Sequence, residues 1–207
     1  TMNKTLGISA ATFGLGGGLF FIGYFLVEVP SNMMLHRFGA RRWIARIMIS
    51  WGIVAACQAL IQGEVSFYLV RILLGVMEAG FFPGVILYLT LWFPTAQRAR
   101  VVALFMVAVP LSTAVGDPVG GLLLKLNGVA GLAGWQWLFV VEGVPTVFIG
   151  LVVLRWLIDR PNHASWLTPQ QRTWLTGTLA AEAREKTSNY SITMRCSYAL
   201  SSPFPAF

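Results

Sequence analysis

Five apolar stretches, each long enough to cross a lipid bilayer, constrain this sequence more than any other feature. A transmembrane helix needs about 20 consecutive, predominantly apolar residues. Of the 207 residues, 56% are hydrophobic and only 11% are charged, which is too little polar surface to cover a soluble domain. The runs also lack the polar faces that repeat every 3.6 residues in a soluble helical bundle. We therefore predict an all-α membrane protein with five transmembrane helices, at 8–35, 43–62, 65–93, 101–124 and 135–157.

The basic residues predict how these helices are oriented. The formal net charge is +7, and Lys and Arg fall in short clusters between apolar runs rather than along one amphipathic face, which disfavours a nucleic-acid partner. Loops rich in Lys and Arg stay in the cytoplasm. Alternate connectors carry the basic residues, whereas the other two contain only Lys125 at an edge. We expect a multi-pass protein of the bacterial inner membrane, with the first residue outside and the last residue in the cytoplasm.

Polar sequence follows the fifth apolar run. Thr168, Pro169 and Gln171 have the spacing of a helix start with a capping box, so a short cytoplasmic helix is expected within 159–186. From Thr187 the composition turns to Ser, Tyr and Pro without periodicity, which predicts disorder over 187–207.

The sequence disfavours an enzyme. The cysteines Cys57 and Cys196 and the histidines His36 and His163 are isolated, so no metal-ligand spacing exists. Neither a nucleophile elbow nor a phosphate-binding loop is present. We therefore predict no catalytic residues, no bound metal and no cofactor.

Five charged residues lie inside the apolar runs, where each costs about 2.5 to 3.5 kcal/mol at a helix centre. Structural pairing between helices or snorkelling to the interface could explain some of these charges. Snorkelling is a strong alternative for Arg71, which lies near a helix end. For Asp117 and Glu142, structural pairing and a polar transport path are equally good interpretations. The mid-helix position of Glu78 favours a function. In sequence order the five charged residues are Glu28, Arg71, Glu78, Asp117 and Glu142.

Arg71 and Glu78 give the third apolar run one polar face. They are seven residues apart, so their side chains leave the same side of the helix at an axial separation of roughly 10 Å. Gly75 lies between them, and Gly80 and Gly84 follow, where a helix can bend. Arg is the preferred partner of a carboxylate, and a carboxyl group in an apolar surrounding can exchange a proton near neutral pH. The pattern indicates proton-coupled anion transport.

Other residues in the apolar runs are expected to serve packing. Gly116, Gly120 and Gly121 have the small-residue spacing that permits close helix contact in lipid. Tyr24 and Trp51 could contact a ligand, but packing is the preferred interpretation.

Three long stretches resemble a known family. They are FFIGYFLVEVPSNMMLHRFGARRWIARI, RILLGVMEAGFFPGVILYLTLWFPTAQRAR, and GWQWLFVVEGVPTVFIGLVVLRWLIDRP with the WLTPQQR that follows. Together they resemble the anion:cation symporter branch of the major facilitator superfamily, and within it the bacterial tartrate, phthalate and sugar-acid permeases. The likeness covers Thr1 to about Glu185.

The resemblance implies a fold and roles for particular residues. The family has twelve helices in two six-helix halves, with the substrate between the halves, so the five predicted helices correspond to its second to sixth. The family's fourth-helix Arg and Glu, implicated in anion binding and proton coupling, fall on Arg71 and Glu78. Asp117 has no matching family residue. The implied cytoplasmic gating loop contains Arg37, Gly39, Arg41 and Arg42.

The same resemblance indicates that the chain is a fragment. The family's first helix and its second half are absent, and the tail SNYSITMRCSYALSSPFPAF is unlike the family's central loop. We therefore expect a truncated transporter of small carboxylates with protons, inactive without the missing helices. The alternative is a membrane-embedded accessory or interaction protein without transport activity.

Overall fold

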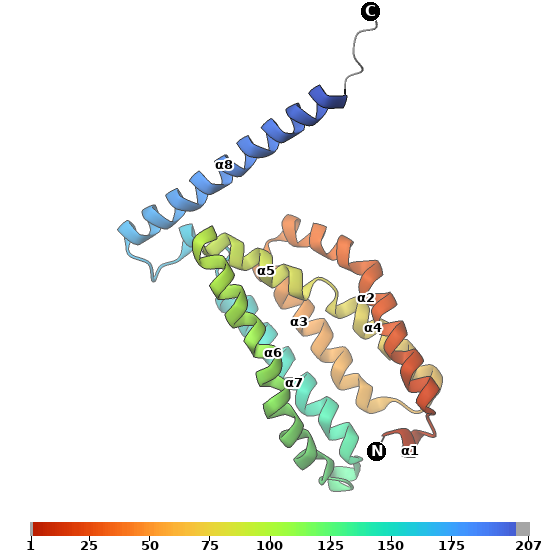
Figure 1. The fold of residues 1–207 in the computed structure, drawn as a ribbon. Helices are drawn as coiled ribbons and strands as arrows, with labels where there is room; N and C mark the ends of the chain where they lie inside the picture. The colour runs from red at the N-terminus through yellow and green to blue at the C-terminus, as the bar shows by residue number, and fades with distance from the viewer. Residues whose placement is uncertain (1, 202–207) are drawn as a thin grey trace, which may run out of the picture.

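The computed structural model describes residues 2–201 and confirms the predicted all-α membrane architecture. Five helical segments are long and apolar enough to cross a membrane, and no strand occurs within 2–201. Figure 1 shows them as a bundle, with one further long helix outside it. In chain order the elements are α1 (Met2–Leu6), α2 (Ala10–Phe38), α3 (Ala40–Cys57), the 3-10 turn η1 (Gln58–Leu60), α4 (Glu64–Glu78), α5 (Phe81–Trp92), α6 (Thr95–Leu124), η2 (Val129–Gly131), α7 (Gly134–Trp156), η3 (Pro161–His163) and α8 (Pro169–Ser201).

The connection between α2 and α3 is much tighter than the sequence suggested. Gly39 alone joins the two helices, with φ at +85°, a backbone conformation that only glycine adopts readily. The Asp159 carboxylate, from the segment after α7, accepts a hydrogen bond from the Arg41 backbone N–H at 2.7 Å. A Cβ on Gly39 would lie 3.2 Å from that carboxylate. The turn therefore needs a glycine both for its φ angle and for the approach of Asp159.

The third membrane span is broken near its middle. α4 ends at Glu78, Gly80 adopts φ +87°, and α5 begins at Phe81. A helix interrupted at membrane depth must satisfy its freed backbone groups within the protein. Ser31 of α2, only 2% exposed, donates its hydroxyl to the Ala79 carbonyl at 2.7 Å. The bend expected near Gly80 is thus a complete break, held by a neighbouring helix.

Glycines allow close contact between two pairs of helices. A Cβ on Gly75 of α4 would overlap the Phe20 carbonyl oxygen of α2, and one on Gly52 of α3 would lie 2.8 Å from the Gly143 carbonyl oxygen of α7. Such contacts bring backbones together where lipid supplies no hydrophobic driving force. These two helix pairs form the centre of the bundle.

Helix α6 differs from the expectation of close packing at its glycines. A Cβ on Gly116 or Gly121 would meet no atom within 4 Å, and one on Gly120 would make only an ordinary contact with Leu138. None of the residues of α6 is buried. In the described part of the chain, Gly116 and Gly121 therefore face no other helix, and Gly120 approaches only the Leu138 side chain of α7.

Helix α8 begins as predicted but extends further. Thr168 and Gln171 form the expected capping box, in which the Gln171 N–H reaches the Thr168 hydroxyl at 3.3 Å and the Thr168 N–H reaches the Gln171 Oε1 at 3.1 Å. The helix passes Thr187, where disorder was expected to begin, and continues to Ser201. The sequence from 178 to 201 contains no Gly or Pro to interrupt a helix. The rest of the predicted disordered tail, 202–207, lies outside the described residues.

Candidate functional site

A cavity of about 430 Å³ lies among α2, α3, α4 and α7. It brings together three of the five charged residues that the sequence analysis singled out, Arg71, Glu78 and Glu142. Glu28 and Asp117 do not line it: Glu28 is half-buried on α2, and Asp117 is exposed on α6. The lining residues are Gly17, Phe20, Phe21, Trp51, Ala55, Gln58, Arg71, Leu74, Glu78, Phe139, Glu142 and Thr146.

Aromatic rings hold the Arg71 guanidinium in place. Its Cζ lies 5.1 Å from the centroid of the Phe67 ring and 5.8 Å from that of Phe13. The two rings stack on each other with centroids 5.9 Å apart, and Phe67 is fully buried. Ring faces attract a guanidinium without using its N–H donors. Among residues 2–201 the Arg71 Nε is buried and has no hydrogen-bond partner.

Glu78 is the last residue of α4 and stands directly before the break in the third span. Its side chain lines the cavity that Arg71 also lines, as the seven-residue spacing predicted. Within the described residues the ion pairs include none to Arg71, Glu78 or Glu142.

Trp51 packs as expected and also lies in the wall of the cavity. Its ring packs against Phe81, with centroids 5.8 Å apart, and it also lines the cavity. Tyr24 does not line the cavity. Helix α3 thus contributes an aromatic wall to the cavity.

The predicted gating residues lie at the other end of the bundle, which we call the basic end: the end with Arg37, Gly39, Arg41, Arg42 and Arg98. They do not reach the cavity. Gly39 forms the turn between the two helices, whereas Arg37 lies in the last turn of α2, and Arg41 and Arg42 lie in the first turn of α3.

Sequence reasoning missed four residues that the structure makes prominent: Ser31, Gln58, Asp159 and Glu182. Gln58 was detectable as a polar residue inside an apolar run. The other three had no signal, because a serine in a membrane helix and an acidic residue in a polar segment are both common. Only the fold shows which helix ends or carbonyl groups they meet.

A bundle of membrane-spanning helices, one broken at mid-length beside unpaired charges in a cavity, is the arrangement found in polytopic transport proteins. The comparison with protein families agrees with this class. Residues 1–204 match the family model of the Major Facilitator Superfamily, and the chain belongs to that superfamily.

Individual relatives agree with the family match. The chain is 56% identical over 193 residues to a protein named putative tartrate transporter from Agrobacterium vitis, covering 93% of this chain and 43% of the relative. It is 48% identical to a quinolone resistance transporter from Acinetobacter baumannii, covering 89% of this chain and 42% of the relative. The chain therefore spans less than half the length of these curated relatives.

The fold is also found in a solved structure. A bacterial homologue of the human lysosomal transporter Spinster, crystallised in an inward-facing and occupied conformation, superposes with a TM-score of 0.71 at 22% identity. The superposition covers 80% of this chain and 40% of the other. At this identity the likeness concerns the fold alone.

Proposed function

We propose that this chain is part of a secondary transporter that moves small organic acid anions, of the tartrate, phthalate or sugar-acid kind, together with protons. Arg71 binds a carboxylate of the substrate, and Glu78 carries the proton. The chain needs the remaining helices of its superfamily's plan for transport. The observation that carries the proposal is that these two unpaired groups line one cavity at a broken helix.

The chemistry of the cavity supports an anion. Arg71 is a cation whose Nε–H has no partner among residues 2–201, and a guanidinium binds a carboxylate with two parallel hydrogen bonds. A second positive group is not among the lining residues. A charged substrate entering together with a proton on Glu78 would change the site's total charge less than the substrate alone.

The same proposal includes the topology. The basic end faces the cytoplasm of a bacterial cell, and the end where α6 meets α7 faces outward. The cavity then lies in the outer half of the bundle and extends to Glu78, which ends α4 near mid-membrane. The lipid bilayer, the substrate and the proton are the partners of this arrangement.

The experiment measures uptake by the full-length protein that carries this sequence, reconstituted in proteoliposomes. Labelled tartrate is supplied outside under an imposed pH gradient, acidic outside. Proton-driven uptake is expected. Glu78→Gln should abolish accumulation driven by the gradient while retaining tartrate exchange across the membrane, because the glutamine cannot release a proton. Unchanged proton-driven uptake in this variant removes Glu78 from the mechanism.

Matched controls separate charge at the site from charge elsewhere. Arg71→Lys keeps the positive charge but loses the planar pair of donors, so the KM for tartrate should rise at least tenfold. Glu185→Gln and Arg184→Lys change exposed residues of α8 and should leave uptake unchanged.

The same reconstituted protein also tests two other functions. Transport of a quinolone without transport of tartrate would assign the cavity to the substrate that the Acinetobacter baumannii relative's name records. Transport of neither, together with co-purification of a membrane partner, would favour the accessory or interaction protein.

A further inference from the structure

Gln58 is a buried polar side chain without a partner. It is the first residue of η1, at the end of α3, and is only 3% exposed. Its Oε1 is buried and has no hydrogen-bond partner among residues 2–201. Most buried polar atoms in native proteins are hydrogen-bonded, so each exception needs an explanation. Gln58 also lines the cavity that contains Arg71 and Glu78.

The backbone around Gln58 is firmly held, so the unpaired amide is not the result of a loose segment. The Gln58 N–H bonds back to carbonyl groups in the last turn of α3. The next residue, Ala59, is fixed by α7, because the Gln136 Nε2 donates to the Ala59 carbonyl at 2.5 Å. The other end of the Gln136 amide is also bonded, since its Oε1 accepts the Ala133 N–H at 2.7 Å. The Gln136 amide is thus bonded to the backbone at both ends, whereas the buried Oε1 of Gln58, a residue of the cavity lining, has no partner among residues 2–201.

The atom that lacks a partner is an acceptor, and this limits the group that can satisfy it. A carboxylate has no hydrogen to donate, so the carboxylate bound by Arg71 cannot also satisfy the Gln58 Oε1. The hydroxyl of the cavity lining, on Thr146, already donates to the Glu142 backbone carbonyl at 2.7 Å. A hydroxyl group on the ligand itself meets the requirement.

We propose that Gln58 is a specificity-determining residue, whose side-chain amide accepts a hydrogen bond from a hydroxyl of a hydroxycarboxylate held by Arg71. This inference rests on the proposed function of the cavity. It narrows the substrate from small organic acids in general to those that carry a hydroxyl beside the carboxylate. An analogue without the hydroxyl would leave the buried amide unpaired, which is how a site rejects a smaller, less polar competitor.

The experiment compares three four-carbon dicarboxylates that differ only in hydroxylation. Tartrate carries two hydroxyls, malate one and succinate none. Labelled tartrate is bound to the purified full-length protein that carries this sequence, and each acid is used as a competitor. The unaltered protein should bind tartrate more tightly than succinate by about 5- to 150-fold, the range expected when a buried group loses its partner.

Gln58→Met tests the residue directly, because methionine has a similar length but no polar amide. The affinity for tartrate should fall by about 5- to 150-fold while that for succinate stays within about twofold, so the preference disappears. Gln58→Asn, which keeps an amide, should restore part of the preference. Gln62→Met is the matched control: Gln62 is exposed, lies four residues further on and does not line the cavity, so both affinities should stay unchanged.

The outcomes separate this inference from the proposed function. An equal loss of tartrate and succinate affinity in Gln58→Met would assign the residue a structural role and overturn the inference. If Gln58→Met does not fold, competition on the unaltered protein still tests the inference, because equal competition by succinate and tartrate would overturn the requirement for a hydroxyl. When tartrate binding depends on Arg71 but ignores hydroxyls, only the role of Gln58 fails. When no dicarboxylate binds, the proposed function fails as well.

Discussion

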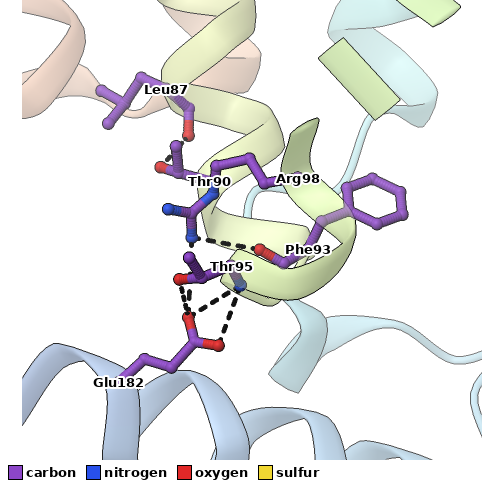
Figure 2. A network of polar contacts seen from close by, with 6 residues as sticks. All are labelled: Leu87, Thr90, Phe93, Thr95, Arg98 and Glu182. Carbon is purple, nitrogen blue, oxygen red and sulfur yellow. Dashed lines mark hydrogen bonds and ion pairs between the residues drawn. The ribbon is translucent and has the colours of Figure 1, made fainter. Parts of the chain in front are cut away.

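Glu182 of α8 caps the first turn of α6 through Thr95. Its carboxylate accepts the Thr95 hydroxyl at 2.6 Å and the Thr95 backbone N–H at 2.9 Å, and it lies 3.8 Å from the Arg98 guanidinium (Figure 2). The residue at the N-cap position is Pro94, which has no side-chain acceptor. The start of α6 therefore obtains its cap from a helix 87 residues further along the chain.

Replacing Glu182 with alanine should loosen the start of α6. Loss of an N-terminal cap costs about 1 kcal/mol, and the carboxylate also interacts favourably with the helix dipole. Hydrogen exchange of the amides at 95–98 should accelerate about fivefold in the purified protein, measured by mass spectrometry. Glu185→Ala, on the exposed side of the same helix, is the control. Equal protection in both variants would show that Glu182 does not stabilise α6.

Asp159 caps the first turn of α3 in the way that Glu182 caps α6. Its carboxylate accepts the Arg41 N–H at the first turn of that helix, where the N-cap residue Gly39 has no side chain. Two helices that begin at the basic end are thus capped by carboxylates from the chain after α7. Helix α8 and the segment before it are tied to the bundle at two separate helix starts, and not only by chain connectivity.

Asp159→Ala should therefore destabilise the α2–α3 turn by about 0.5 to 2 kcal/mol, because the cap is lost. Asp159→Asn keeps an acceptor oxygen and should lose less than half as much. Both free energies of unfolding can be compared in detergent with that of the unaltered protein. If the asparagine variant is as unstable as the alanine variant, charge rather than the hydrogen bond holds this turn.

The sequence predicted the parts of the molecule that depend on composition and periodicity. Lipid requires long apolar helices, so the five spans were evident, and the spacing of Arg71 and Glu78 places both on one face of α4 regardless of tertiary structure. Gln58 and Glu142 could not be assigned to the same cavity, because that depends on how α3 and α7 cross. The caps from Asp159 and Glu182 span 118 and 87 residues, distances at which local patterns carry no information.

Gly80→Ala should be strongly destabilising. The position has φ +87°, which costs an L-residue about 1 to 2 kcal/mol, and a Cβ there would overlap the Ser31 hydroxyl. Since that hydroxyl also satisfies the Ala79 carbonyl, moving it leaves the broken helix unpaired. Thermal unfolding in detergent should shift down by several degrees. Gly177→Ala, in an open helical position of α8, should be neutral or slightly stabilising, and a similar loss in both variants would contradict this account.

The proposed topology predicts which positions face the outside of the cell. Lys125 lies at the end of α6 away from the basic end, and Arg184 lies on α8 beyond it. In a background with Cys57→Ser and Cys196→Ser, a membrane-impermeant maleimide should label Lys125→Cys in intact cells and Arg184→Cys only after permeabilisation. The expectation follows from the retention of Arg-rich connectors in the cytoplasm. The opposite labelling pattern would mean that the protein is inverted in the membrane, with the cavity in the cytoplasmic half of the bundle.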